Sequence, residues 1–503
     1  MVDVPYPSAV TDLPSGAAPL TDTPRTAGSR ASRSGLVWRS VVTRERAPLV
    51  AAVVLICGYA VIRTLGAADL VALSWTAIAV GTSLLSPLAG MVVLASLSPF
   101  LEAQTAAGVI TAGPVLAMAV VASVLGRMPS WWPSIAGRWS RSARWALFAG
   151  VAILLGTALG VFTTLVRLGP ATAVDAARFW AVGIGAGLLL MFSSAVLGRR
   201  GHTEGLVAVT VATLLAGLLS LIDYLVRGSV VASPFGWLLR PDNDYIRLTG
   251  VIPAPNASAM LFLLPATMLG ALALFPPFRA GVGTAGTRIR IVSAVLAVTM
   301  VTAVALAYSR SSLLALVVVV TLLAWRVRRV AGVVASLACI VGALALASAA
   351  LDARGVIARV GVIDVNTIGD QQRIEAWTAA LRMWADAPLT GLGFRSFEAL
   401  HGQYGARVIA SPHNEWLRFF AEDGTVVGIL GLVFIGAALI ALSRGRSWPI
   451  IGAFCTFGAF VVMASFNNPL TYLQIVVPTF IVIGTGLGLT ASTTGVPAER
   501  DGG

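Results

Sequence analysis

Apolar runs long enough to cross a lipid bilayer recur along almost the whole sequence. A helix needs roughly 20 apolar residues to span the hydrocarbon core, and about fourteen runs of this kind are present. The runs cover 47–63, 69–85, 86–101, 108–126, 145–166, 177–197, 205–225, 256–275, 290–308, 311–325, 330–350, 425–443, 448–466 and 472–490. The sequence therefore predicts an all-α, polytopic transmembrane helix bundle of about 12–14 spans.

The charge content of the chain supports a membrane protein. Soluble domains carry roughly 25% charged residues, whereas here 11% of residues are charged and 57% are hydrophobic. The net charge of +13 comes from arginine, because the chain contains no lysine. Most of these arginines lie between apolar runs, where they indicate topology rather than binding of nucleic acid. Cys57, Cys339 and Cys455 lie inside apolar runs, so we expect neither a disulfide framework nor a metal cluster.

The positions of the arginines also predict the orientation, because short cytoplasmic loops are enriched in basic residues. Residues 1–46 are rich in Pro, Ser, Thr and Arg and are expected to form a disordered cytoplasmic tail, with no cleavable signal peptide. With fourteen spans, five successive arginine clusters then fall on the inner side. If 69–85 and 86–101 formed a single hairpin, the basic tail would lie outside. We therefore expect a multi-pass protein of the cell inner (cytoplasmic) membrane with both termini, including 491–503, in the cytoplasm.

Three longer segments remain outside in this arrangement. Two of them separate an N-terminal group of spans (47–225), a central group (256–350) and a C-terminal group (425–490), and the third lies within the N-terminal group. The outer segments are 98–107, 226–255 and 351–424. The last is too long for a simple connector and is predicted to be a large extracytoplasmic helical loop.

This loop carries helical signals of its own. Ile374, Trp377, Leu381 and Trp384 recur at three- and four-residue spacing within 370–386, which predicts an amphipathic helix suited to the membrane surface. Its two tryptophans either stack on sugars or anchor the helix, and anchoring is the simpler role. A turn containing Gly391 and Gly393 follows, and a second helix is predicted to begin near Pro412 and run toward the next span.

Three arginines lie on the predicted outer side, although basic residues are enriched on the cytoplasmic side. Their position therefore calls for an explanation. Arg310 lies at the mouth between two spans, and Arg247 and Arg373 lie in the outer segments. A charge at membrane depth costs several kcal/mol unless it is paired or bound to an anion. Snorkelling to lipid phosphates is one explanation. The other is a diphosphate ligand, which planar and permanently charged guanidinium groups bind well.

His413 is the candidate proton acceptor. It is one of three histidines in the chain and lies in the outer loop just before a predicted span. A lone loop histidine is more often structural or solvated, but outer arginines nearby favour a catalytic base. Asp242-Asn243-Asp244 resembles the acidic triplet of metal-dependent glycosyltransferases, a pattern that is common by chance. No motif for a nucleotide, a dinucleotide or zinc is present, so the sequence predicts neither a cofactor nor a metal site.

Four sequence segments, taken together and in this order, resemble the O-antigen ligase and O-antigen polymerase superfamily of membrane glycosyltransferases. The resemblance covers roughly 240–490. The segments are RLTGVIPAPN at 247–256, Ser309-Arg310-Ser311, the Arg…Trp…Pro…Gly-x-Gly…Phe block at 373–397, and HNEWLRFFAEDG at 413–424. The chain departs from the family pattern in one place. Three residues separate Gly424 from Gly428 where the family commonly has two, which leaves the start of the next span open.

The resemblance implies a metal-independent transferase that moves an undecaprenyl-diphosphate-linked glycan onto an acceptor hydroxyl at the outer face of the membrane. The acceptor is a glycan or a lipid-linked glycan. His413 and Arg310 would be the catalytic residues, and Arg247, Arg373 and Asn414 would bind substrate. Two other hypotheses remain open on the sequence alone. One is a transporter or flippase of lipid-linked sugars, and the other is a related polymerase of peptidoglycan strands.

Overall fold

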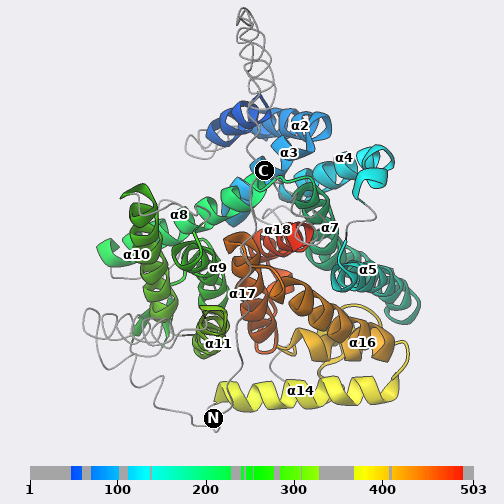
Figure 1. Cartoon of the computed structure of the whole chain (residues 1–503). Coiled ribbons are helices and arrows are strands. Elements are labelled where there is room, and N and C mark those ends of the chain that lie inside the picture. The colour runs from blue at the N-terminus through cyan, green and yellow to red at the C-terminus, as the bar shows by residue number, and fades with distance from the viewer. Residues whose placement is uncertain are drawn as a thin grey trace, which may run out of the picture. The chain divides into compact units, whose positions relative to one another are not determined.

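The computed structural model is helical apart from one short β-hairpin, within the residues that it describes (Figure 1). These residues are 47–58, 69–100, 112–135, 139–227, 240–242, 245–252, 254–276, 284–307, 309–327, 368–406 and 411–490. Nine of the helices in these ranges are long and apolar enough to cross a membrane. The predicted all-α, polytopic bundle is therefore confirmed.

The long membrane helices follow the predicted apolar runs closely. They are α4 (Ala112–Ile135), α5 (Arg141–Leu168), α6 (Pro170–Trp180) continued through the π-helical segment η3 (Ala181–Gly185) into α7 (Ala186–Arg199), α8 (Glu204–Arg227), α9 (Pro255–Leu274), α10 (Thr284–Leu306), α11 (Arg310–Val327), α16 (Glu415–Ser443) and α18 (Leu473–Thr490). The predicted run 330–350 lies outside the described residues.

Four shorter apolar helices cover the remaining runs. One is Ala47–Gly58, and the others are α2 (Asp69–Leu85), α3 (Pro87–Leu97) with the 3-10 turn η1 (Ser98–Phe100), and α17 (Trp448–Ala464). The break between α2 and α3 has a local cause: Ser86 caps α3 by accepting a hydrogen bond from the Ala89 N–H, and Pro87 occupies its first turn. The runs 69–85 and 86–101 thus form two separate helices that pack against each other.

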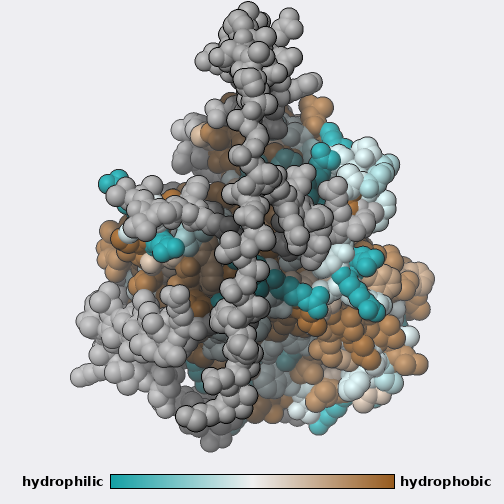
Figure 2. Space-filling view, viewed as in Figure 1, coloured by the Kyte–Doolittle hydropathy of each residue, from teal (hydrophilic) through white to brown (hydrophobic). Residues whose placement is uncertain are grey.

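The outer faces of α5 and α16 carry an exposed apolar stripe. On α5 the exposed side chains include Phe148, Leu155, Leu159 and Phe162, at helical three- and four-residue spacing. The space-filling view shows this side of the molecule as predominantly hydrophobic (Figure 2). Contiguous apolar surface of this extent is unfavourable in water, and acyl chains are its natural environment in a multi-pass membrane protein.

The most buried helix, α18, packs directly on α7. A side chain at Gly484 would lie 2.1 Å from the carbonyl oxygen of Met191, and one at Gly488 would lie 2.2 Å from that of Ala195. The two glycines are four residues apart, so they form a small-residue face that lets the two helix backbones touch. This contact fixes the position of the turn that precedes α18.

The large loop contains the helices α14 (Ile368–Asp386) and α15 (Ser396–Leu400), and α14 lies across α16 (Figure 1). The predicted helix at 370–386 therefore exists. The side chains that pack it onto the protein are Ala376, Ala379, Ala380 and Met383. Trp377 and Trp384 contact the protein through Phe466 and Phe420, respectively, while Ile374 and Leu381 are about half exposed. Contact of Ile374 and Leu381 with the membrane surface remains a prediction.

Candidate functional site

Helix α16 breaks at Gly424, and the loop supplies the hydrogen bonds that the break removes. Gly424 has φ 81°, which favours glycine. The N–H groups of Leu392 and Gly393 donate to the carbonyl oxygens of Ala421 and Glu422 at 3.1 and 2.8 Å. In return, the N–H of Thr425 donates to the carbonyl oxygen of Pro388 at 2.7 Å. The second helical part of α16 therefore begins at 425, and the start of the membrane span at this residue remains a prediction.

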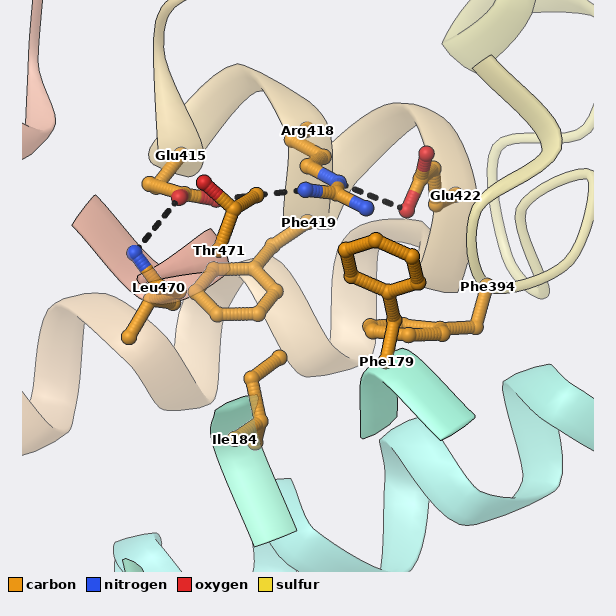
Figure 3. Close-up of a pocket in the computed structure, with 9 residues that line it drawn as sticks. All are labelled: Phe179, Ile184, Phe394, Glu415, Arg418, Phe419, Glu422, Leu470 and Thr471. Carbon is orange, nitrogen blue, oxygen red and sulfur yellow. Dashed lines mark hydrogen bonds and ion pairs between the residues drawn. The ribbon is translucent and has the colours of Figure 1, made fainter. Parts of the chain in front are cut away.

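A buried cluster of charges lies on the first two turns of α16 (Figure 3). The guanidinium of Arg418 is within 4 Å of three carboxylates: Glu422 at 3.0 Å, Glu398 at 3.3 Å and Glu415 at 3.8 Å. The side chain of Arg418 is 6% exposed and that of Glu422 is fully buried. The Glu422 carboxylate also accepts the backbone N–H groups of Arg395 and Phe397. Buried charges need this degree of compensation, so the cluster ties the loop to α16.

The same cluster extends to α6 through Arg395. Its Nε lies 3.2 Å from Asp175 and its guanidinium covers the ring of Phe179. Burial lowers the pKa of Arg395, while Glu398 and Asp175 oppose this shift. Between α6, α16 and the turn before α18 remains a cavity of about 10 Å³, lined by Phe179, Glu415, Arg418 and Glu422 among others (Figure 3). This volume is about that of one water molecule, so the cluster is a packed support and not a substrate pocket.

A much larger and partly open cavity lies between α11 and α14. Its volume is about 280 Å³, and it is lined by Arg310, Ser311, Leu314, Arg373, Ile374, Trp377 and Phe466. Arg310 is exposed at the first position of α11, and Arg373 is half-buried on α14. The structure therefore brings together two of the arginines singled out in the sequence, with apolar and aromatic side chains beside them.

His413 lies directly before Asn414 and α16, and it is not one of the residues that line this cavity. Burial lowers the pKa of His413 to about 4, and the nearby positive charge of Arg373 adds to this shift. His413 has φ 48°, a left-handed conformation that costs energy for a residue with a side chain. At neutral pH its imidazole is uncharged and able to accept a proton.

Asn414 has a structural role in the arrangement. Its side-chain oxygen accepts hydrogen bonds from the N–H groups of Trp416 and Leu417, both at 3.1 Å, and it is the N-cap of α16. Substrate binding by Asn414 remains a prediction. The other loop histidine, His401, stacks on Phe397, and its Nδ1 lies 3.1 Å from the Glu398 carbonyl oxygen.

Arg247 belongs to the β-hairpin formed by β1 (Arg240–Asp242) and β2 (Tyr245–Arg247), in which it pairs with Arg240. The next residue, Leu248, donates its N–H to the carbonyl oxygen of Leu306 at 3.0 Å. Leu306 ends α10, four residues before Arg310. The backbone after Arg247 therefore lies at the α10–α11 turn, beside the start of the helix that carries Arg310.

The turn between α17 and α18 was not singled out in the sequence, yet it contacts most of these segments. It consists of Ser465 to Asn468 and the 3-10 turn η4 (Pro469–Thr471), and we call it the 465–471 turn. Phe466 lines the large cavity, and Asn467 donates to Ser311 at 2.8 Å. The consecutive asparagines of FNNP, at the end of an apolar run, are the sequence signal that marks it.

The Asp242-Asn243-Asp244 triplet lies mostly outside the described residues, so the structure does not test it as a metal site. Within the part of the chain that the structure describes, no group of three or more His, Cys, Asp or Glu side chains is arranged to hold a metal ion. Residues 243 and 244 lie outside the described ranges.

The fold and the cavity define a multi-pass membrane protein with two arginines and a histidine gathered where α11, α14 and α16 begin or cross. Residues 295–433 match the family model of O-antigen ligase. The matched segment includes Arg310, Arg373 and His413, and this part of a multi-pass membrane protein is similar to O-antigen ligases. A comparison with curated proteins finds no match.

Proposed function

We propose that this protein transfers a glycan from an undecaprenyl-diphosphate-linked donor to an acceptor hydroxyl at the outer face of the cytoplasmic membrane, as a polysaccharide polymerase or ligase. One observation carries the proposal. Arg310 and Arg373 line the same cavity, and His413 lies close enough to Arg373 for its charge to affect the histidine pKa. These two features support a diphosphate site at Arg310 and Arg373, with His413 as its proton acceptor.

The two arginines suit the diphosphate of the donor. Guanidinium groups bind phosphate oxygens through paired, charge-assisted hydrogen bonds. In the transfer, negative charge grows on the diphosphate as its bond to the sugar breaks, and fixed positive charges stabilise that change. Arg247 would join them from the α10–α11 turn, where its backbone lies. Leu314 and Ile374, both half-exposed at the cavity, offer the apolar contacts that an isoprenyl chain needs.

The proposed reaction needs one proton acceptor. The acceptor hydroxyl oxygen forms a bond to the anomeric carbon, the bond from that carbon to the diphosphate oxygen breaks, and His413 takes the hydroxyl proton. Undecaprenyl diphosphate leaves as the anion. A pKa of about 4 makes free His413 a weak base, but a diphosphate bound beside Arg373 adds negative charge near the imidazole. Donor binding would therefore raise the pKa of His413 toward the range that favours proton transfer.

The test uses purified protein in nanodiscs with a radiolabelled undecaprenyl-diphosphate oligosaccharide. The expected result is label in a longer glycan or in a ligated acceptor, with undecaprenyl diphosphate released in equal amount and with no loss of rate in chelator. A chelator-sensitive reaction would contradict the metal-independent mechanism. In proteoliposomes, movement of intact donor across the membrane without transfer would instead support a transporter of lipid-linked sugars.

A further inference from the structure

The 465–471 turn contacts each of the three segments that contribute to the proposed site. These are the start of α11 with Arg310, helix α14 with Arg373, and the segment before α16 with His413. The turn lies outside residues 295–433, which match the family model. Its side chains therefore connect the matched segment to the C-terminal helices.

Asn467 holds the start of α11. Its Nδ2 donates to the hydroxyl of Ser311 at 2.8 Å, directly after Arg310. The Ser311 hydroxyl lies 3.2 Å from that of Ser309, which accepts a hydrogen bond from the Ser312 hydroxyl at 2.7 Å. Asn467 is only 9% exposed. A buried amide that is tied into a chain of hydroxyl groups leaves the first turn of α11 little freedom to move.

Asn468 holds the segment that carries His413. Its Nδ2 donates to the hydroxyl of Ser411, two residues before His413. Two further contacts join the turn to the same segment. The Leu470 N–H donates to the Glu415 carboxylate at 3.1 Å, and the Trp416 indole N–H donates to the Ser465 hydroxyl at 3.0 Å.

Phe466 reaches the third segment. Its ring centroid lies 6.4 Å from that of Trp377, and both rings line the large cavity. Trp377 follows Arg373 by four residues, one turn of α14. The turn itself is fixed between α17 and α18, which are almost entirely buried. It is thus a turn held between two buried helices, with contacts to all three segments of the proposed site.

We propose that Asn467 and Asn468 are positioning residues of the transfer reaction: Asn467 sets the place of Arg310 through Ser311, and Asn468 sets the place of His413 through Ser411. The inference rests on the proposed function, because it assigns the two asparagines to the two sides of the same site. Two neighbouring side chains on one turn would then fix the distance between the diphosphate-binding and proton-accepting groups. Catalytic geometry of this kind tolerates only about 0.5 Å of error.

The experiment compares Asn467→Ala and Asn468→Ala with Thr456→Val. The control removes a 2.6 Å hydrogen bond between Thr456 and Thr267, which joins α17 to α9 away from the cavity. For each variant we would measure binding of undecaprenyl diphosphate, kcat and KM for the labelled donor, the dependence of rate on pH, and the melting temperature in detergent.

The two asparagine variants should differ from each other. Asn467→Ala is expected to weaken undecaprenyl diphosphate binding and raise the donor KM by about tenfold, because a misplaced group loses one to two orders of magnitude. Asn468→Ala is expected to lower kcat by about tenfold to a hundredfold. It should also move the acid limb of the rate profile upward, since a loosened His413 gains water while Arg373 on α14 and Glu415 on its own segment stay in place. Thr456→Val should leave undecaprenyl diphosphate binding, the donor KM, kcat and the pH profile unchanged.

Double-mutant cycles test whether Asn467 acts through Ser311 and whether Asn468 acts through Ser411. Ser311→Ala should reproduce Asn467→Ala, and the double variant should lose no more than either single variant; Ser411→Ala should behave in the same way with Asn468→Ala. If both asparagine variants kept wild-type binding, kcat, KM and pH profile, or lost only thermal stability, the positioning role would be wrong while the proposed function stood. A wild-type protein that neither bound undecaprenyl diphosphate nor transferred glycan would overturn both proposals.

Discussion

Arg418 and the pair Arg310 and Arg373 have opposite surroundings, although all three belong to the matched family segment. Arg418 is 6% exposed and has three carboxylates within 4 Å. Arg310 is exposed at the start of α11 and borders a cavity of about 280 Å³ with Arg373. A guanidinium enclosed by carboxylates serves the fold, whereas Arg310 and Arg373 border an open cavity in which we propose that an anionic ligand binds. Replacements on the two sides should therefore damage different properties.

The largest expected effect on activity follows from Arg310→Ala and His413→Ala. Each should lower the rate of glycan transfer by about a hundredfold or more, because one loses stabilisation of the leaving diphosphate and the other loses the proton acceptor. Membrane insertion and melting temperature should stay near the wild-type values, since Arg310 is exposed and His413 is only partly buried. The measurement is transfer of labelled glycan by purified variants, with melting followed in the same preparations. Full activity in both variants would remove these residues from the reaction.

Arg418→Met should show the reverse pattern. It leaves the buried Glu422 without its 3.0 Å partner, and breaking a buried pair on one side costs about 3–5 kcal/mol. We expect a large fall in melting temperature and in yield of folded protein. The double variant Arg418→Met with Glu422→Gln removes both charges and should recover part of the loss. A folded, stable Arg418→Met protein lacking only activity would place Arg418 in the reaction instead of the framework.

The contrast between these arginines shows what the sequence can predict. The spans are readable because their length and hydrophobicity follow from bilayer thickness. Arg310, Arg373 and His413 stand out because the predicted topology places them outside, where arginine is unusual and a histidine close to arginines suggests a catalytic base. The structural role of Arg418 cannot be predicted from the sequence in this way. Its spacing to Glu422 resembles an ordinary helical i,i+4 pair, and its other anchors, Glu398 and the residues around Arg395, come together only when the loop packs on α16.

Asn414 and the 465–471 turn illustrate two further limits. Asn414 was predicted to bind substrate because it follows His413, yet an Asn directly before a helical segment is also an N-cap signal, and the structure shows the cap. Asn467 and Asn468 contact Ser311 and Ser411 from 156 and 57 residues away in the chain. No local pattern reports such contacts, because they depend on how α17 and α18 pack into the bundle.

The pH dependence of the reaction tests the role of His413 as the proton acceptor. Because burial and Arg373 lower its pKa to about 4, the base form is present above about pH 4 and is lost as the pH falls through this value. The acid limb of kcat/KM, which reports the free enzyme, should therefore lie near pH 4. The acid limb of kcat, which reports the enzyme with bound donor, should lie at a higher pH. The bound donor adds negative charge beside Arg373 and so raises the pKa of His413.

Arg373→Gln provides the control for this profile. Removing the cation should move the acid limb of kcat/KM upward, but not as far as an ordinary histidine near 6.5, because burial is the larger cause of the shift. The variant should also raise the donor KM. An acid limb that stayed near pH 4 in Arg373→Gln would mean that burial alone sets the pKa of His413.

The smallest expected effect concerns Asn414. This side chain caps α16 and is also predicted to bind substrate, so it could serve the fold, the reaction or both. Asn414→Ala removes the cap of α16 and should cost about 1 kcal/mol of stability, seen as a modest fall in melting temperature. Asn414→Ser and Asn414→Asp keep a capping oxygen, so both should restore stability. If the cap is the only role, they should also restore kcat and KM for the donor. If the side-chain amide binds substrate, Asn414→Asp would stay impaired even though its helix is capped, because a carboxylate next to the diphosphate repels it and lacks the amide N–H donors.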